Sequence, residues 1–141
     1  MATLSEVCIA LRDQLRTVMT TVHYPMPGSI SGNQITAVVF SAAGDLTYRG
    51  GSEQEWMETI RVQIYAGTQD TPTTIGALDG LIEPIADLFS ADNVISHTLG
   101  GIVDFCKLSS YELSQTLEVA GHSFYGGTLS FSVKRRRFSG D

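Results

Sequence analysis

The sequence predicts an α+β domain in which two α-helices pack on a mostly antiparallel β-sheet, with projecting β-hairpin loops. Three observations support this fold class. Apolar residues recur at helical spacing in two segments, apolar and polar residues alternate in several others, and glycine or proline lies between them. The chain has 141 residues, a length typical of one domain, so we expect a single domain over residues 1–141.

The first predicted helix covers residues 3–22. Thr3 and Glu6 have the spacing of a capping box, in which each side chain accepts a hydrogen bond from a free backbone N–H of the first turn. The proline-containing segment 23–33 ends the helix. The apolar stripe also has coiled-coil spacing, but its short length before a proline loop favours a helix lying on a sheet. The stripe consists of Leu4, Cys8, Leu11, Leu15, Val18 and Val22.

Strands are predicted in the next segment. Residues 34–40 are rich in β-branched side chains and indicate a buried strand. Residues 44–56 then form an exposed hairpin or long loop around Gly50 and Gly51. Residues 55–67 alternate strictly, as expected for a strand with one face in the core. That core face comprises Trp56, Glu58, Ile60, Val62 and Ile64.

A second helix is predicted over residues 68–90. It begins at Thr71 and Pro72, because proline in the first turn loses no helical hydrogen bond. Pro84 should kink the helix or split it near Gly80, since the proline ring collides with the preceding turn. The buried stripe comprises Ile75, Leu78, Ile82, Ile85 and Phe89.

The remainder of the chain is predicted to be mostly strand. Residues 91–110 indicate a turn, a short strand, a bend at two glycines and another strand. Residues 111–119 and 128–138 then pair as a hairpin, joined by a loop over residues 120–127. On the first hairpin strand one face carries Tyr111, Leu113, Gln115, Leu117 and Val119, and on the second Leu129, Phe131 and Val133.

Charge is distributed unevenly along the chain. The formal net charge is −6, but residues 1–133 carry −9 and residues 134–141 carry +3. An acidic body disfavours coating of duplex DNA over the whole surface, because affinity for phosphates depends on clustered cations. Any nucleic-acid contact would therefore be local. The basic extension, residues 134–141, contains four consecutive cations: Lys134, Arg135, Arg136 and Arg137.

This basic run continues the last predicted strand beyond its apolar face, which ends at Val133. If the hairpin is in register, Leu113 lies beside Arg135 and Glu112 beside Arg136, so the strand end is charged on both faces. It should then project from the domain or lie at a rim. Lysine and arginine can protect a strand edge from aggregation, but four cations exceed that need. Contact with a phosphate backbone and contact with an acidic neighbouring subunit are favoured equally. Replacing all four cations should leave the domain folded and impair assembly.

No catalytic, cofactor or metal site is expected. Cys8 and Cys106 are too few for a disulfide scaffold, and the place of Cys8 on the apolar helix stripe predicts a buried reduced thiol there. The three histidines lack metal-ligand spacing, and the glycine pairs lack the Lys-Ser/Thr of phosphate-binding loops. A cluster of three carboxylates, which can in principle perform acid–base chemistry, is interpreted as a solvated rim: Glu53, Glu55 and Glu58. We expect neither a signal peptide nor a membrane span.

An ordered series of features over residues 34–133 resembles the small tail-terminator proteins of long-tailed bacteriophages. The series begins with the strand "ITAVVF", the glycine-containing hairpin "DLTYRGGSEQEW" and the strand "TIRVQIYAG". It continues through "ALDGLIEPI" and "TLGGIVDFCKLSSY" to the final hairpin "LEVAGHSFYGGTLSFSV". The order and spacing of these segments carry the resemblance, and no single motif is specific to the family.

The resemblance implies a structural virion protein without catalysis or cofactor. Such proteins form a homohexameric ring that caps the head-proximal end of the tail tube, stops tube polymerisation and offers an attachment surface to the neck. The implied partners are other copies of the chain, the tail tube protein, a neck or head-completion protein, and genomic DNA that passes without sequence-specific binding. No membrane partner is implied, and assembly would occur in the host cytoplasm. The alternatives are a neck or head–tail joining protein and, more remotely, a small nucleic-acid-binding protein.

Two departures from the family pattern stand out. Pro84 interrupts the second helix, and residues 134–141 extend beyond the usual end of the last strand. The candidate contact residues fall into two groups. The basic run is the candidate surface for a subunit or DNA, and a second set is expected on exposed hairpins facing a partner: Tyr48, Arg49, Glu53, Glu55, His122 and Tyr125.

Overall fold

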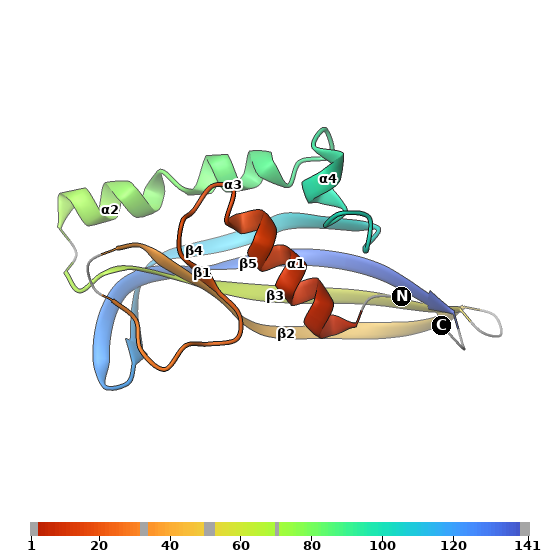
Figure 1. Ribbon diagram of the computed structural model, residues 1–141, viewed down its shortest axis with the longest axis horizontal. Coiled ribbons are helices and arrows are strands. Elements are labelled where there is room, and N and C mark those ends of the chain that lie inside the picture. The colour runs from red at the N-terminus through yellow and green to blue at the C-terminus, as the bar shows by residue number, and fades with distance from the viewer. Residues whose placement is uncertain (1–2, 32–33, 50–52, 70, 139–141) are drawn as a thin grey trace.

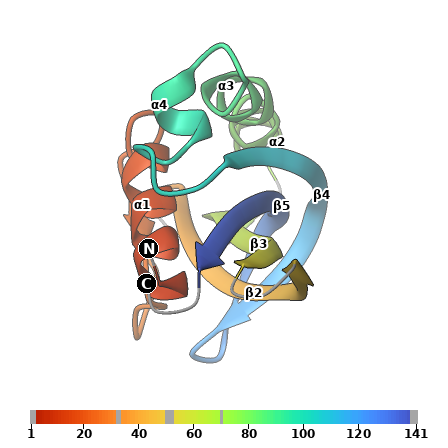
Figure 2. The same ribbon diagram turned by 90° about the vertical axis from the view of Figure 1, so that its right-hand side faces the viewer.

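The computed structural model describes residues 3–31, 34–49, 53–69 and 71–138 (Figure 1). It contains one five-stranded sheet with the strand order β1-β2-β3-β5-β4, and helices gather on one face of this curved sheet (Figure 2). Only the short β1–β2 pair is parallel among the described strands, so the mostly antiparallel α+β fold is confirmed. The strands are β1 Val22–His23, β2 Thr36–Arg49, β3 Glu53–Gly67, β4 Phe105–Val119 and β5 His122–Phe138. The helices are α1 Leu4–Leu15, α2 Pro72–Asp79, α3 Ile82–Leu88 and α4 Val94–His97.

Helix α1 begins as predicted but ends earlier. The Thr3 hydroxyl accepts a hydrogen bond from the backbone N–H of Glu6, so the expected N-cap is present. The prediction of a helix to residue 22 is wrong, because α1 ends at Leu15 and Val22 lies in β1. The Arg16 guanidinium donates to the carbonyl oxygen of Val22 at 2.9 Å, which holds the chain as it turns back towards the sheet.

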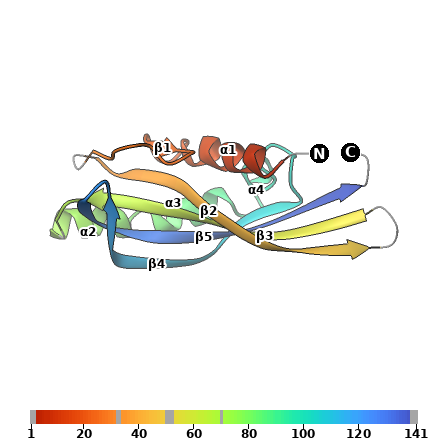
Figure 3. The same cartoon turned by 90° about the horizontal axis from the view of Figure 1, so that it is seen from below.

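Strands β2 and β3 form a long hairpin that projects past the helices (Figure 3). Residues 44–49 and 53–56, predicted as an exposed hairpin or long loop, continue the two strands with regular pairing as far as Arg49 and Glu53. The end of β5 pairs alongside β3 over this region. We call this projecting part the arm and define it as residues 44–49, 53–58 and 134–138.

The second predicted helix is split where proline requires it. Thr71 caps α2 and Pro72 occupies its first turn, whereas Gly80 ends it and Pro84 lies in the separate helix α3. The short strand predicted within residues 91–110 is wrong, because that segment forms the helical turn α4. The hydroxyl of Thr98 donates to the carbonyl oxygen of Val94 at 2.7 Å and so closes this turn locally.

The final hairpin has a tighter turn than predicted. Ala120 and Gly121 have φ values of 51° and 81°, and positive φ at both central residues is typical of two-residue hairpin turns. Residues 122–127 are therefore strand, and the predicted loop over residues 120–127 is wrong. This turn fixes a different register, in which Glu112 pairs with Thr128 and not with Arg136. Leu113 likewise does not pair with Arg135, whose neighbour on β3 is Trp56.

The main core fills the space between the helices and the sheet. Leu11 and Leu15 of α1 have no exposed surface. The same is true of the predicted core residues of β3, except that Trp56 is half-buried and Glu58 is charged. A second, smaller cluster lies on the opposite face, where the β4–β5 hairpin curls below the sheet (Figure 1). There Tyr65 and Phe124 meet edge to face, with 5.6 Å between ring centroids. Gly127 allows β4 and β5 to approach closely, because an added Cβ atom there would lie 2.7 Å from the Glu112 carbonyl oxygen.

Candidate functional site

The basic run belongs to the arm. Lys134 lies within the sheet between Met57 of β3 and Phe105 of β4. Because β4 begins at Phe105, the residues of β5 that follow Lys134 have no β4 partner. They pair with β3 alone, within the arm. The expectation that the basic strand end projects from the domain is therefore confirmed.

Arg135 is buried on the helix side of the arm, so the expected exposure of both charged faces is wrong. Its side chain and that of Glu58 are each 6% exposed, and Arg135 Nε donates to Glu58 Oε1 at 2.5 Å. A second contact joins Arg135 Nη2 to Glu58 Oε2 at 3.4 Å. The guanidinium also lies 4.8 Å from the centre of the Trp56 ring, a favourable cation–π arrangement. Breaking a buried ion pair leaves an uncompensated charge, so Arg135 has a structural role in the monomer.

The other face of the arm carries ion pairs as well. Lys134 Nζ lies 3.7 Å from Glu55 Oε1, and Arg136 Nε lies 3.1 Å from Asp104 Oδ2 and 4.0 Å from Glu53 Oε1. The interpretation of the carboxylate cluster as a solvated rim is wrong for Glu55 and Glu58, which are both buried. The register of β3 with β5 places acids of one strand beside cations of the other. An acidic partner of the basic run is thus β3 of the same chain.

The expectation that the four cations can be replaced without loss of folding is therefore revised. Removal of Arg135 would leave the buried Glu58 carboxylate without this counter-charge. Arg136 remains suited to an outside contact, because its side chain is 51% exposed. The side chains of Arg137 and Arg49, both predicted contact residues, lie outside the described part of the structure.

The predicted hairpin contacts fall at opposite ends of the sheet. Tyr48 lies in the arm and is 69% exposed, and Glu53 and Glu55 lie there on the opposite strand of the same hairpin. His122 is exposed directly after the β4–β5 turn, and Tyr125 is half-buried and pairs with Gly67 at the other end of β3. These residues therefore do not form one surface.

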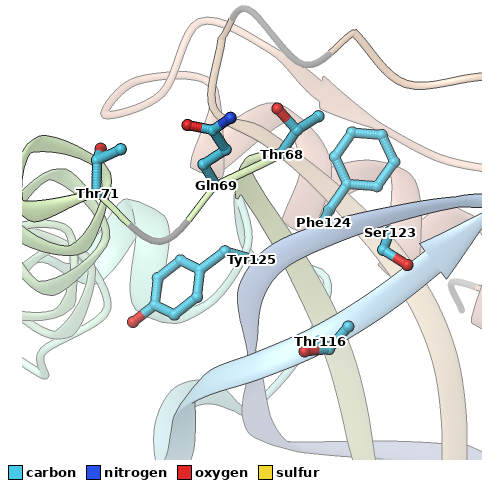
Figure 4. A pocket seen from close by; sticks show the side chains of 7 residues that line it. All are labelled: Thr68, Gln69, Thr71, Thr116, Ser123, Phe124 and Tyr125. Carbon is cyan, nitrogen blue, oxygen red and sulfur yellow. The ribbon is translucent and has the colours of Figure 1, made fainter.

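One cavity of the described residues lies beside the β4–β5 hairpin. Its volume is about 440 Å³. Figure 4 shows its lining side chains between the β3–α2 loop and the β4–β5 hairpin. Its lining is neutral, with hydroxyl, amide and phenol groups, and no nucleophile lies beside a base: Thr68, Gln69, Thr71, Thr116, Ser123, Phe124 and Tyr125. Within the described residues, no group of three His, Cys, Asp or Glu side chains is placed to hold a metal ion.

Both cysteines are free and buried. Burial raises the pKa of the Cys106 thiol to about 12 and also raises the pKa of Cys8, since a thiolate loses its hydration inside the protein. Neither thiol has the lowered pKa of a reactive cysteine. Among the helices that the structure describes, none is long and apolar enough to cross a membrane.

Sequence inspection missed a cavity of about 190 Å³ between the start of α1 and the arm. Leu4, Leu46 and Trp56 form its apolar walls. The signal was present but short, because residues 44–48 alternate between small or apolar and polar side chains like a strand. The paired glycines that follow, Gly50 and Gly51, favoured a loop instead.

A scan of protein-family models and a search of curated protein sequences found no match to this chain. The fold and the arm therefore define it at the level of class. It is an α+β protein whose distinctive feature among the described residues is a projecting, charge-paired strand arm.

Proposed function

We propose that this chain is a structural virion protein that forms a homohexameric ring at the head-proximal end of a phage tail tube. The ring would stop tube polymerisation and present an attachment surface to the neck. The observation that carries the proposal is the arm, which extends beyond the helices and can reach a neighbouring subunit or the tube. The ordered resemblance over residues 34–133 supports the same role.

The asymmetry of the sheet also supports a closed ring. A ring of identical subunits joined head to tail needs a different surface on each side of the subunit. Here one edge of the sheet is β2 with the short β1 and with α1 beside them, and the other edge is β4. The two sides differ in side chains and in helix cover, as a heterologous interface requires.

The charge pattern is compatible with passage of DNA and argues against a nucleic-acid-binding function. Lys134, Arg135 and Arg136 are each paired with carboxylates of the same chain. The described side chains of the basic run are therefore engaged within the chain, and the chain as a whole carries −6. A ring of such subunits would let DNA slide through an acidic lumen, because carboxylates do not attract phosphates.

Electron microscopy of virus particles assembled without this chain tests the proposal. Overlong tail tubes that lack heads are expected, and supplying the chain from a plasmid should restore normal tails. Tails of normal length beside separate filled heads would instead assign the chain to the neck as a head–tail joining protein. Ordinary infectious particles would exclude both roles.

A further inference from the structure

Two long edges of the sheet are open within the described part of the chain. On its outer side β2 pairs with β1 only at Ala37 and Val38, so residues 40–49 face no described strand. At the other end of the sheet, β4 pairs with β5 alone. An open edge presents unpaired backbone groups and is a template for the addition of another strand.

The cavity beside β2 lies along one of these edges. It is lined mainly by apolar side chains and by the small residues of β2: Leu4, Ala42, Ala43, Gly44, Asp45, Leu46, Trp56 and Glu58. A cavity of about 150 Å³ can accept a benzene ring, so the 190 Å³ here is sufficient for one aromatic side chain. Leu4 is 38% exposed and belongs to the rim.

The opposite edge offers an aromatic side chain. Tyr111 of β4 is 57% exposed, although it pairs with Leu129 of β5, which is fully buried in the helix-side core. Paired residues of an antiparallel sheet lie on the same face. Tyr111 therefore occupies a helix-side position at an edge where no described helix buries it.

The cavity occupies that same helix-side face. Of the β2 residues that line it, Ala42 pairs with the core residue Ile60, and Leu46 pairs with Trp56. If the β4 edge of one copy continued the sheet of another beyond β2, Tyr111 would fall on the side where the cavity opens. Strands β2 and β4 run in opposite directions, because three antiparallel pairings separate them. A copy related by rotation about the strand direction thus presents β4 antiparallel to β2.

We propose that β4 of one copy adds to the open edge of β2 in the next copy, and that Tyr111 fills the cavity between α1 and the arm. Register irregularities between Leu108 and Ser110 and between Glu112 and Gln115 limit regular pairing to the segment centred on Tyr111. Such irregularities discourage indiscriminate strand addition, so the aromatic contact supplies the specificity. The inference rests on the proposed ring, because it requires head-to-tail association of identical chains.

Oxidative trapping of the purified chain tests this interface. Within one copy, positions 46 and 111 are separated by β3 and β5, so a disulfide between them must join two copies. Leu46→Cys combined with Tyr111→Cys should give a ladder of covalent oligomers that a reductant removes. Each single variant should give no ladder. Cys8 and Cys106 are buried and should not contribute.

Sedimentation supplies the second measurement. Tyr111→Ser should weaken self-association by about thirtyfold or more, as truncation of an aromatic hot spot does, with an unchanged unfolding midpoint. Ile95→Ser is the matched control, because Ile95 is 69% exposed on α4 and belongs neither to the lining of the cavity nor to the β4 segment around Tyr111.

Three results would overturn the interface. These are an absence of the ladder at concentrations where the wild type is oligomeric, equal effects of the two serine variants, and a wild type that stays monomeric up to millimolar concentration. The particle experiment described above judges the ring itself separately. Overlong tails together with a failed trap would retain the ring and reject this interface.

Discussion

Replacement of Arg135 by methionine should destabilise the monomer strongly. The change retains a long apolar stem but removes the guanidinium that contacts Glu58 at 2.5 Å and covers the Trp56 ring. Both side chains of the ion pair are 6% exposed, so water cannot readily solvate the carboxylate that remains. Breaking a buried pair from one side typically costs 3–5 kcal/mol, so we expect a loss of about that size. For a domain with a total stability of about 5–15 kcal/mol, this is a large fraction.

A matched surface variant separates burial from charge. Arg136→Met removes the same group from the next residue, where the side chain is 51% exposed and lies 3.1 Å from Asp104. Exposed ion pairs contribute about 0–1 kcal/mol, so this control should change the free energy of unfolding little. The double variant Glu58→Leu with Arg135→Met should lose much less than the sum of the two single variants, because no buried charge is then left alone.

Urea unfolding followed by tryptophan fluorescence measures these differences. Trp56 is the only tryptophan in the chain and lies against Arg135, so its emission reports directly on the arm. A loss for Arg135→Met no greater than that for Arg136→Met would refute the assignment of Arg135 as a buried structural cation. Strict additivity in the double variant would refute coupling between Arg135 and Glu58.

Further predictions concern packing and thiol ionisation. Gly126→Ala should lower the free energy of unfolding by at least about 1–3 kcal/mol, because the new methyl group would overlap the carbonyl oxygen of Ile64. Gly76→Ala, in the open interior of α2, should instead raise it by about 0.5–1 kcal/mol. Thermal unfolding measures both changes. Leu11→Ala should lower the free energy of unfolding by roughly 2–5 kcal/mol, and a loss below 1 kcal/mol would mean that its site collapses. Burial raises the pKa of Cys106 to about 12, above the unfolded value of about 8.5, so its contribution to stability is complete below pH 8.5 and declines as pH rises towards 12. In urea unfolding, the difference in free energy of unfolding between the wild type and Cys106→Ala should therefore shrink as pH rises above about 8.5.

Local patterns were sufficient to predict the elements that depend on local chemistry. The alternation around Ile60 and Val62 identified the buried face of β3, and Pro84 marked the break between α2 and α3. The register of β5 was not accessible in this way. It depends on a two-residue turn in which Ala120 has a positive φ. Residues other than glycine rarely adopt this conformation, so an alanine at this position does not predict the turn.

The contacts of the basic run could not be predicted without that register. Glu58 and Arg135 are 77 residues apart in sequence, and no spacing rule links them. Their contact follows only when β5 is known to lie beside β3. The same fact converts three carboxylates from a predicted solvated rim into partners of the basic run, so the error in the site followed from the error in topology.

The position of β5 also has a consequence for synthesis of the protein. β5 lies between β3 and β4 in the sheet, yet the ribosome makes both of those strands before it. Until β5 emerges, β4 has no partner strand beside the β1-β2-β3 sheet, and Leu129 and Phe131 cannot complete the core. Nonlocal pairing of this kind slows folding and exposes unpaired edges. Holdase chaperones should therefore engage this chain during translation, and premature stop codons before β5 should give protein that is degraded.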